Sequence, residues 1–292
     1  MWNSAPVLLL LTGALLGLTL PFGKIAAETG IFASLWAFVI SGGAGIVLLA
    51  ALVLMRKRPS LNWPKLRYYM VVAAISYVIP NLLILEAIPR LGAGYTGIMY
   101  TVSPILTLLI TVILRQRRPN LLGVAGIVVG FIGALMVALT RGHVGQPADP
   151  VWIGIAFLIP LCLAVGNVYR TLDWPQGADP LELAAGSHLM AALMLVGMIL
   201  FQSGGFPAEQ LAAVPWLAVA QVAASAGTFA LFFRLQQVGG PVYLSQIGYV
   251  AAAIGLFSGV AFLGESYRLL TWAGAVIIAL GVIMTTRAQS RG

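Results

Sequence analysis

Charged residues are scarce in this chain of 292 residues: only 8% are charged, whereas 60% are hydrophobic. Soluble domains contain about 25% charged residues. A soluble fold of this length would have to expose much of this apolar side-chain area to water. Runs of about twenty apolar residues recur along the chain, and a helix of that length crosses a hydrocarbon layer of about 30 Å. The composition therefore indicates a polytopic membrane protein.

Residues that carry covalent or metal chemistry are also rare, since Cys162 is the single cysteine and His143 and His188 are the two histidines. No intramolecular disulfide can form, and no CxxC, zinc-binding or HExxH spacing occurs. The chain has no GxxxxGK[ST] loop for ATP and no GxSxG or kinase motif. We therefore expect no metal, no cofactor and no enzymatic activity. A membrane enzyme acting on lipid is a remote alternative, because it would need a cluster of acids or histidines.

Ten apolar segments follow one another, and each predicts a transmembrane helix, because a strand of a membrane barrel needs only about ten alternating residues. Their approximate bounds are 4–23, 32–55, 67–87, 93–114, 121–140, 151–172, 181–202, 213–234, 241–263 and 269–287. A polar break at 142–150 divides the chain into a first unit, 1–141, and a second unit, 151–292. The expected fold is an all-α membrane protein with two five-helix repeats.

The fifth and tenth segments are similar in sequence. LLGVAGIVVGFIG (121–133) and LLTWAGAVIIALG (269–281) are identical at six of thirteen positions, with an offset of 269 − 121 = 148. A unit of five helices that starts on one side of the membrane ends on the other, so the second copy must be inserted upside down. Inverted repeats of this kind are the architecture of many secondary transporters.

Basic residues lie mostly on one side of the expected topology. The side that holds both termini carries twelve: Arg56, Lys57, Arg58, Lys65, Arg67, Arg115, Arg117, Arg118, Arg170, Arg234, Arg287 and Arg291. The other side carries four: Lys24, Arg90, Arg141 and Arg268. This bias predicts that both termini are cytoplasmic. The net charge of +8 is thus a signal of topology, and we expect no nucleic-acid partner.

Several short motifs occur in a fixed order along the ten segments: Gly17–Lys24, Leu91–Gly94, Ser103-Pro104, Leu263–Glu265 and the paired glycines Gly126/Gly133 and Gly274/Gly281. Together with the inverted repeat, they resemble the drug/metabolite transporter superfamily in its EamA-type branch. Within it, the chain looks most like the exporters of aromatic and other neutral amino acids. The resemblance implies a bacterial inner membrane and a central cavity lined by helices 1, 3, 4, 6, 8 and 9. One departure is that Arg117-Arg118 stands where the first half would match Gly264-Glu265.

Polar residues inside spans are costly in lipid, so they should face protein or water. Those on shared helical faces are our candidates for substrate binding: Tyr77, Asn81, Tyr100, Ser103, Asn167, Tyr169, Gln221, Tyr243, Gln246 and Tyr249. On the ninth helix, residues 243, 246 and 249 are spaced by three. Each candidate has a structural alternative, because tyrosines anchor helix ends at the interface and amides bond between packed helices. His188 is expected to be a packed histidine.

Proline and glycine interrupt several spans and free backbone groups for bending. The candidate hinges are Pro21, Pro80, Pro104, Gly240 and Pro241. Four charged residues are further candidates: Lys24, Glu86, Arg170 and Glu265. Lys24 and Arg170 are either helix-end residues that reach toward water or groups that draw a carboxylate to the cavity from opposite sides.

All eight acids fall at or near expected helix ends, whereas proton-coupled carriers usually keep a carboxylate in mid-membrane. We therefore expect a facilitative secondary transporter, acting as a monomer in the bilayer, that exports small neutral or zwitterionic metabolites by alternating access. Aromatic walls without a fixed mid-membrane charge suit amino acids with apolar side chains. The alternative is an exporter of drugs, nucleosides or other metabolites with proton coupling.

Overall fold

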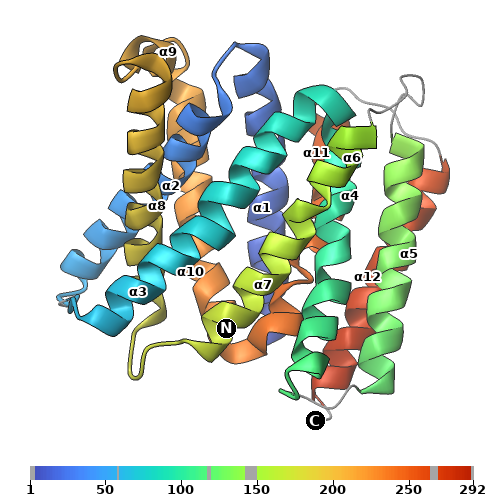
Figure 1. Ribbon diagram of the computed structural model, residues 1–292. Coiled ribbons are helices and arrows are strands. Elements are labelled where there is room, and N and C mark those ends of the chain that lie inside the picture. The colour runs from blue at the N-terminus through green and yellow to red at the C-terminus, as the bar shows by residue number, and fades with distance from the viewer. Residues whose placement is uncertain (1–3, 58, 117–119, 142–149, 264–268, 291–292) are drawn as a thin grey trace.

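The computed structural model describes residues 4–57, 59–116, 120–141, 150–263 and 269–290, and within these ranges every regular element is a helix (Figure 1). The elements of the first half are α1 (Ala5–Glu28), α2 (Ala33–Leu54), α3 (Trp63–Val72), the π-helix η1 (Ala73–Val78), α4 (Ile79–Ile113) and α5 (Leu121–Arg141). Those of the second half are α6 (Pro150–Ala156), α7 (Leu158–Leu172), α8 (Pro180–Ser203), α9 (Ala208–Ala212), α10 (Pro215–Leu244), α11 (Ile247–Leu263) and α12 (Leu269–Ser290).

The ten predicted spans are confirmed as helices. In the described ranges, seven helical stretches are long and apolar enough to cross a membrane. The fourth and fifth predicted spans correspond to the shorter apolar stretches Tyr100–Ile113 and Leu121–Met136, and the ninth corresponds to the 17-residue helix α11. The prediction of an all-α membrane protein with ten transmembrane helices therefore holds.

Several boundaries differ from the prediction. The third and fourth spans are continuous with each other. Figure 1 shows the chain rising along α3, η1 and the first part of α4, turning at the top and descending along the rest of α4. The sixth span is divided into α6 and α7 at Phe157, because Pro160 has no N–H to bond to the carbonyl of Ala156. The ninth span begins at Ile247 rather than at 241, and the short helix α9 was not predicted.

The two similar stretches noticed in the sequence pack against each other. A Cβ atom added to Gly126 would lie 2.9 Å from the carbonyl oxygen of Gly281, and one added to Gly133 would lie 2.7 Å from that of Gly274. Because 126 pairs with 281 and 133 with 274, α5 and α12 are antiparallel. At the offset of 148, each contact maps onto the other, as in an interface with two-fold symmetry. The inverted repeat is therefore visible in this pairing, which we call the α5–α12 seam.

A second pair of equivalent helices packs in the same way. A Cβ atom on Gly42 of α2 would lie 3.5 Å from Ala192 of α8, and one on Gly45 would lie 2.9 Å from Leu189, so these helices are also antiparallel. Small residues allow such close approach of helices where lipid provides no hydrophobic driving force. Glycines thus allow close packing of the two halves at α2–α8 and at α5–α12, which lie on opposite sides of the molecule in Figure 1.

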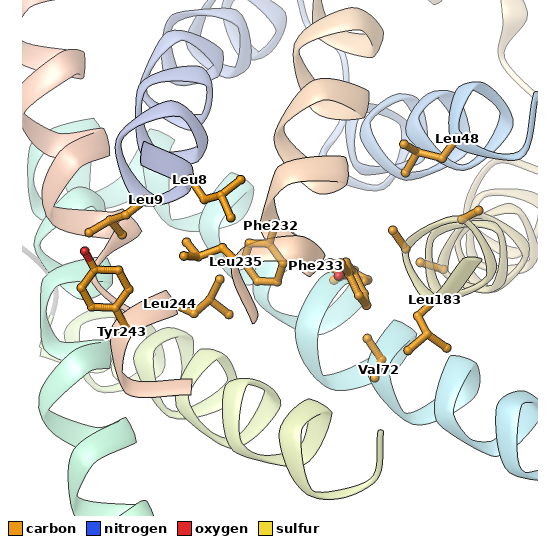
Figure 2. Packing of buried hydrophobic residues seen from close by; sticks show 14 of the residues in the cluster. Leu8, Leu9, Leu48, Val72, Leu183, Phe232, Phe233, Leu235, Tyr243 and Leu244 are labelled. Atoms are coloured by element: carbon orange, nitrogen blue, oxygen red, sulfur yellow. The ribbon is translucent and has the colours of Figure 1, made fainter. Parts of the chain in front are cut away.

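The largest buried apolar cluster crosses from one half to the other. Figure 2 shows Leu8 of α1 near Phe232 of α10 and Leu9 near Tyr243, with Phe233, Val72 and Leu183 on the other side of Phe232. The halves therefore share one core instead of forming separate domains, and polar side chains between them are buried by both.

Candidate functional site

A small cavity lies between the two halves, which we call the central cavity. It is lined by α1, η1 and α4 from the first half and by α7, α10 and α11 from the second, and its volume is about 80 Å³. Its polar lining consists of Ser76, Tyr77, Asn81, Tyr100, Ser103, Asn167, Arg170, Thr228 and Ser245. Its apolar wall is formed chiefly by Leu16, Ile84, Leu163, Phe229, Phe232 and Ile247.

Arg170 is the charged residue of this lining. It lies in the last turn of α7 and is only 2% exposed. Its Nη1 donates to Ser76 Oγ at 2.5 Å and its Nη2 to Asn167 Oδ1 at 2.5 Å. Its Nε donates to Gln236 Oε1 at 3.3 Å, and the guanidinium carbon lies 4.7 Å from the centroid of the Phe232 ring. Every acceptor is neutral, and none of the ion pairs in the described part of the chain includes Arg170.

This burial corrects the expectation that no fixed charge lies deep in the cavity. A residue in the last turn of a helix usually reaches toward water. Arg170 turns inward because Gly166, one turn earlier, leaves space: a Cβ at Gly166 would collide with Ser76 Oγ and lie 3.3 Å from Arg170 Nη1. Gln236 supports the same group, since its Nε2 donates to the backbone oxygen of Asn167 at 3.0 Å. Ser76 and Gln236 were not predicted as site residues.

An aromatic group adjoins this polar centre. The Tyr77 ring stacks on His188 with centroids 4.0 Å apart, and His188 is 3.9 Å from the Phe229 ring. His188 is fully buried, as expected of a packed histidine. Neither of its ring nitrogens, nor the hydroxyl of Tyr77 or Ser103, has a hydrogen-bond partner among the described residues. Buried polar groups are normally paired, so this clustering of unpaired groups marks a place where a ligand or water can bind.

Two further cavities lie on either side of the central one. The first, of about 80 Å³, includes Trp36 and Gln221 and shares Asn81, Tyr100 and Phe229 with the central cavity. The second, of about 230 Å³, lies toward the opposite end, where Gln116 and the kinked segment Gly239–Val242 line it. The first cavity therefore adjoins the central one, whereas the second shares no lining residue with it.

Six predicted site residues line these spaces. Tyr77, Asn81, Tyr100, Ser103 and Asn167 line the central cavity, and Gln221 lines the neighbouring one. Residues 77 and 81, and residues 100 and 103, which have helical spacing in the sequence, thus line the same cavity.

Four other predicted site residues are not brought to these cavities. Tyr169 donates to Asp173 Oδ2 at 2.5 Å, near the end of α7. Tyr243 bonds to Thr286 at 2.8 Å, Gln246 accepts from Thr285, and Tyr249 donates to the carbonyl of Ile127 at 3.1 Å, so the last three face α5 and α12. The argument from spacing fails because the helix is interrupted between Leu244 and Ile247, and because periodicity does not say which neighbour a face meets.

Among the candidate hinges, Gly240 has a non-helical backbone, with φ 71° and ψ −179°. This conformation is available essentially only to glycine. Pro241 follows it inside α10, and Pro80 follows the π-helix η1, a form that often occurs at functional sites. Pro21 and Pro104 lie within α1 and α4, which continue past them.

The remaining charge candidates lie away from the central cavity. Glu86 pairs with Arg90 at 2.5 Å, and both side chains are nearly half exposed. Lys24 lies one turn from the end of α1 and is half-buried, and it is absent from the cavity lining. Glu265 lies outside the described residues. Lys24 and Arg170 thus do not form the matched pair that the sequence suggested as one possibility.

Two inverted halves of membrane-spanning helices around a central polar cavity define the class of membrane transporters. The chain belongs to the EamA-like transporter family, whose model matches residues 3–139 and again residues 151–287. The two matches are offset by 151 − 3 = 148, which equals the offset between the similar stretches in the fifth and tenth helices. The resemblance to the EamA-type branch is thereby confirmed, whereas the subgroup of amino-acid exporters stays a prediction.

Two individual proteins are similar to the chain. A WAT1-related protein of Arabidopsis thaliana is 24% identical over 220 residues, which cover 68% of this chain. The chain spans about two thirds (65%) of the length of that relative. A solved crystal structure of another protein superposes with a TM-score of 0.77 at 19% identity and covers 99% of both chains. At this identity the second likeness shows the shared fold.

Proposed function

We propose that this chain is a facilitative secondary transporter that exports small zwitterionic metabolites, chiefly amino acids with apolar side chains. The observation that carries the proposal is the central cavity, which lies between the two halves and combines unpaired polar groups with an aromatic wall. Binding sites of secondary transporters with inverted repeats lie at this position. One chain carries both of the inverted halves that form such a site, so we propose a monomer as the working unit.

The size of the central cavity supports transport by alternating access. About 80 Å³ holds two or three water molecules at about 30 Å³ each, whereas ligand pockets measure about 300–1,000 Å³. An amino acid therefore requires the halves to move apart. The kink at Gly240 and the π-helix η1 both interrupt regular α-helical structure in elements that line the cavities, next to the spaces that would have to widen.

The acids of the described residues support a facilitative mechanism, because none of them lines the central cavity. Asp173, Asp179, Glu182 and Glu86 form ion pairs with basic residues near helix ends. A carboxylate in an ion pair at a helix end is poorly suited to carry a proton across the membrane together with the substrate.

We further propose a bacterial inner membrane as the location, with both termini in the cytoplasm. Twelve basic residues against four favour this orientation. A periplasm-dependent reporter enzyme fused after Gly292 should be inactive, and the same reporter inserted in the 142–150 link should be active. The reverse pattern would contradict the orientation.

The function can be tested by counterflow in liposomes. Vesicles preloaded with one unlabelled amino acid should accumulate labelled phenylalanine, methionine or threonine transiently, with or without a pH gradient. Absence of counterflow for every amino acid, in tight vesicles with correctly inserted protein, would contradict the proposal.

Proton-coupled export of drugs or nucleosides is the second candidate. It is favoured by His188, a titratable ring that is fully buried against Tyr77 without a described hydrogen-bond partner. Transport that needs the pH gradient, and that becomes independent of it in His188→Gln, would favour this candidate over facilitative export.

A further inference from the structure

The most unusual feature of the central cavity is a buried cation that has no counter-ion among the described residues. Lys57, Lys65, Arg67 and Arg90 each contact a carboxylate. Arg170 is more deeply buried than any of these side chains, yet its acceptors in the described structure are one hydroxyl and two amide oxygens. Buried charges in proteins are normally paired with an opposite charge, so an anion is the missing partner of this site.

The guanidinium group is held in a fixed orientation that still has donors to offer. An arginine side chain has five N–H donors, and the hydrogen bonds to Ser76, Asn167 and Gln236 use one each from Nη1, Nη2 and Nε. Two N–H groups are thus left for another acceptor. The Phe232 ring covers one face of the group, so a ligand would approach in the guanidinium plane. Carboxylates bind arginine in this plane, by two parallel hydrogen bonds.

The charge of the lining distinguishes a carboxylate from a phosphate. Among the described residues, no second basic side chain lines the central cavity. One guanidinium balances one carboxylate, whereas a phosphate monoester carries nearly two negative charges at neutral pH. The present volume of about 80 Å³ also accommodates a carboxylate before the cavity widens.

The other residues of the cavity lining indicate which chemical groups the rest of the ligand would carry. Leu16, Ile84, Leu163, Phe229 and Ile247 form an apolar wall next to Tyr77 and Tyr100, which suits an aliphatic or aromatic group. In the described ranges no acid lines the cavity to pair with an ammonium group, although Asn81, Ser103 and Ser245 could accept hydrogen bonds from one. The lining therefore provides a charge for the carboxylate end of an amino acid and none for the amino end.

We propose that Arg170 binds the carboxylate of the substrate, and that the transporter recognises monocarboxylates with an apolar body whether or not they carry an amino group. This inference rests on the proposed transport function and narrows its substrate class. It predicts that the carboxylate is essential, that the ammonium is dispensable and that amines of the same shape are rejected.

Three compounds with the same aromatic body test this on the wild-type protein: phenylalanine, 3-phenylpropionate and phenethylamine. Each is added at pH 7 to the full chain in detergent, and ligand binding is measured by the rise in thermal unfolding temperature. We expect both carboxylates to raise the midpoint and phenethylamine to leave it unchanged. Stabilisation by the amine alone, or by none of the three, would overturn the proposal.

The role of Arg170 is tested with Arg170→Gln and Arg170→Lys, and Arg90→Gln is the matched control because its ion pair with Glu86 lies near the surface. We expect Arg170→Gln to weaken binding of 3-phenylpropionate at least tenfold, Arg170→Lys to restore part of it, and Arg90→Gln to bind like the wild type. Unchanged binding by Arg170→Gln would overturn the assignment. If Arg170→Gln does not fold, the wild-type comparison of acid and amine still decides the proposal.

The two proposals fail in different ways. Stabilisation by carboxylates without any amino-acid counterflow would leave the carboxylate site standing and contradict amino-acid transport. Amino-acid counterflow that is equally fast in Arg170→Gln would leave the transport function standing and contradict the carboxylate site.

Discussion

At the α5–α12 seam, Gly126 meets Gly281 and Gly133 meets Gly274, so each contact is repeated by its counterpart in the other half. At the central cavity the repeat is broken: at the same offset of 148, Arg170 corresponds to Phe22 and Asn167 to Thr19. The glycines of the seam occur at equivalent positions in both halves, and the two helices pack closely there. The polar residues of the central cavity differ from those at the equivalent positions of the other half, and some of their polar groups have no hydrogen-bond partner among the described residues.

This difference indicates that the α5–α12 seam serves as the structural scaffold and that the central cavity serves as the binding site. Symmetric contacts between small residues serve packing, which both copies of a repeat need equally. A binding site at the boundary of two inverted halves faces both of them, so one cation from one half is enough to recognise one anion. We therefore expect substitutions at the seam to affect folding and substitutions at the cavity to affect transport.

The largest effect should come from breaking the seam with Gly133→Val. Its Cβ would lie 2.6 Å from the backbone nitrogen of Ile278 and 2.7 Å from the oxygen of Gly274, and neither backbone atom can move aside. We expect a loss of about 3 kcal/mol of stability by overpacking, measured as a lower unfolding midpoint in detergent. Gly197→Ala is the control, because nothing lies within 4 Å of its added Cβ. Equal midpoints for the two variants would show that the seam is not close-packed.

A smaller effect on stability and a larger one on transport should follow from Gln236→Leu. The change removes the acceptor of Arg170 Nε and the donor to Asn167, so the guanidinium loses its orientation. We expect transport at low substrate concentration to fall about tenfold, with a stability change of about 1 kcal/mol. The exposed neighbour Gln237→Leu should transport normally. A Gln236→Leu protein that unfolds early and transports normally when folded would reverse our distinction between seam and cavity.

The sequence predicted features that depend on single helices, but it did not predict contacts between helices. Apolar runs predicted ten helices, and the similarity of the fifth and tenth segments, with five helices in each unit, predicted an inverted repeat. Tyr77 and Asn81 lie in the lining of the central cavity, whereas Tyr249 faces α5, since periodicity gives a face but not its neighbour. The burial of Arg170 depends on the space at Gly166, a contact between helices that no single helix reveals.

An intermediate effect on transport is expected for Gly240→Ala. Gly240 forms the kink of α10 and lines the cavity of about 230 Å³. With φ at 71° and ψ at −179°, an alanine would be strained by about 1–3 kcal/mol. If the kink forms part of the movement between open and closed states, the counterflow rate should fall while equilibrium binding of substrate is retained. A variant with wild-type counterflow would show that this bend takes no part in transport.

The smallest effect concerns an ion pair outside the membrane-spanning segments. Burial alone would raise the pKa of Asp179, but the hydrogen bonds from Lys57 at 2.5 Å and from the Leu181 amide at 2.8 Å lower it below its ordinary value. A lowered pKa means that the stabilisation is complete above about pH 4 and is lost as the pH falls through the lowered value. Asp179→Asn, which can still cap α8, should therefore lose less stability than the wild type as the pH falls below about 4.

The prediction for Asp179 needs a control in which another carboxylate is replaced by its amide. Glu209→Gln, on the exposed helix α9, should follow the wild-type pH dependence of the unfolding midpoint. Identical curves for Asp179→Asn and the wild type would show that the Lys57 pair adds nothing to stability.

The most direct test of the distinction between scaffold and site is the rate at which a water-soluble thiol reagent reacts at two buried positions during transport. Ser103 lines the central cavity and is 3% exposed, whereas Thr285 belongs to the seam and is 4% exposed. In a Cys162→Ser background, we predict that Ser103→Cys reacts and that its modification blocks counterflow, while Thr285→Cys stays unreactive. Equal reaction at both positions, or full transport after modification of Ser103→Cys, would contradict the account.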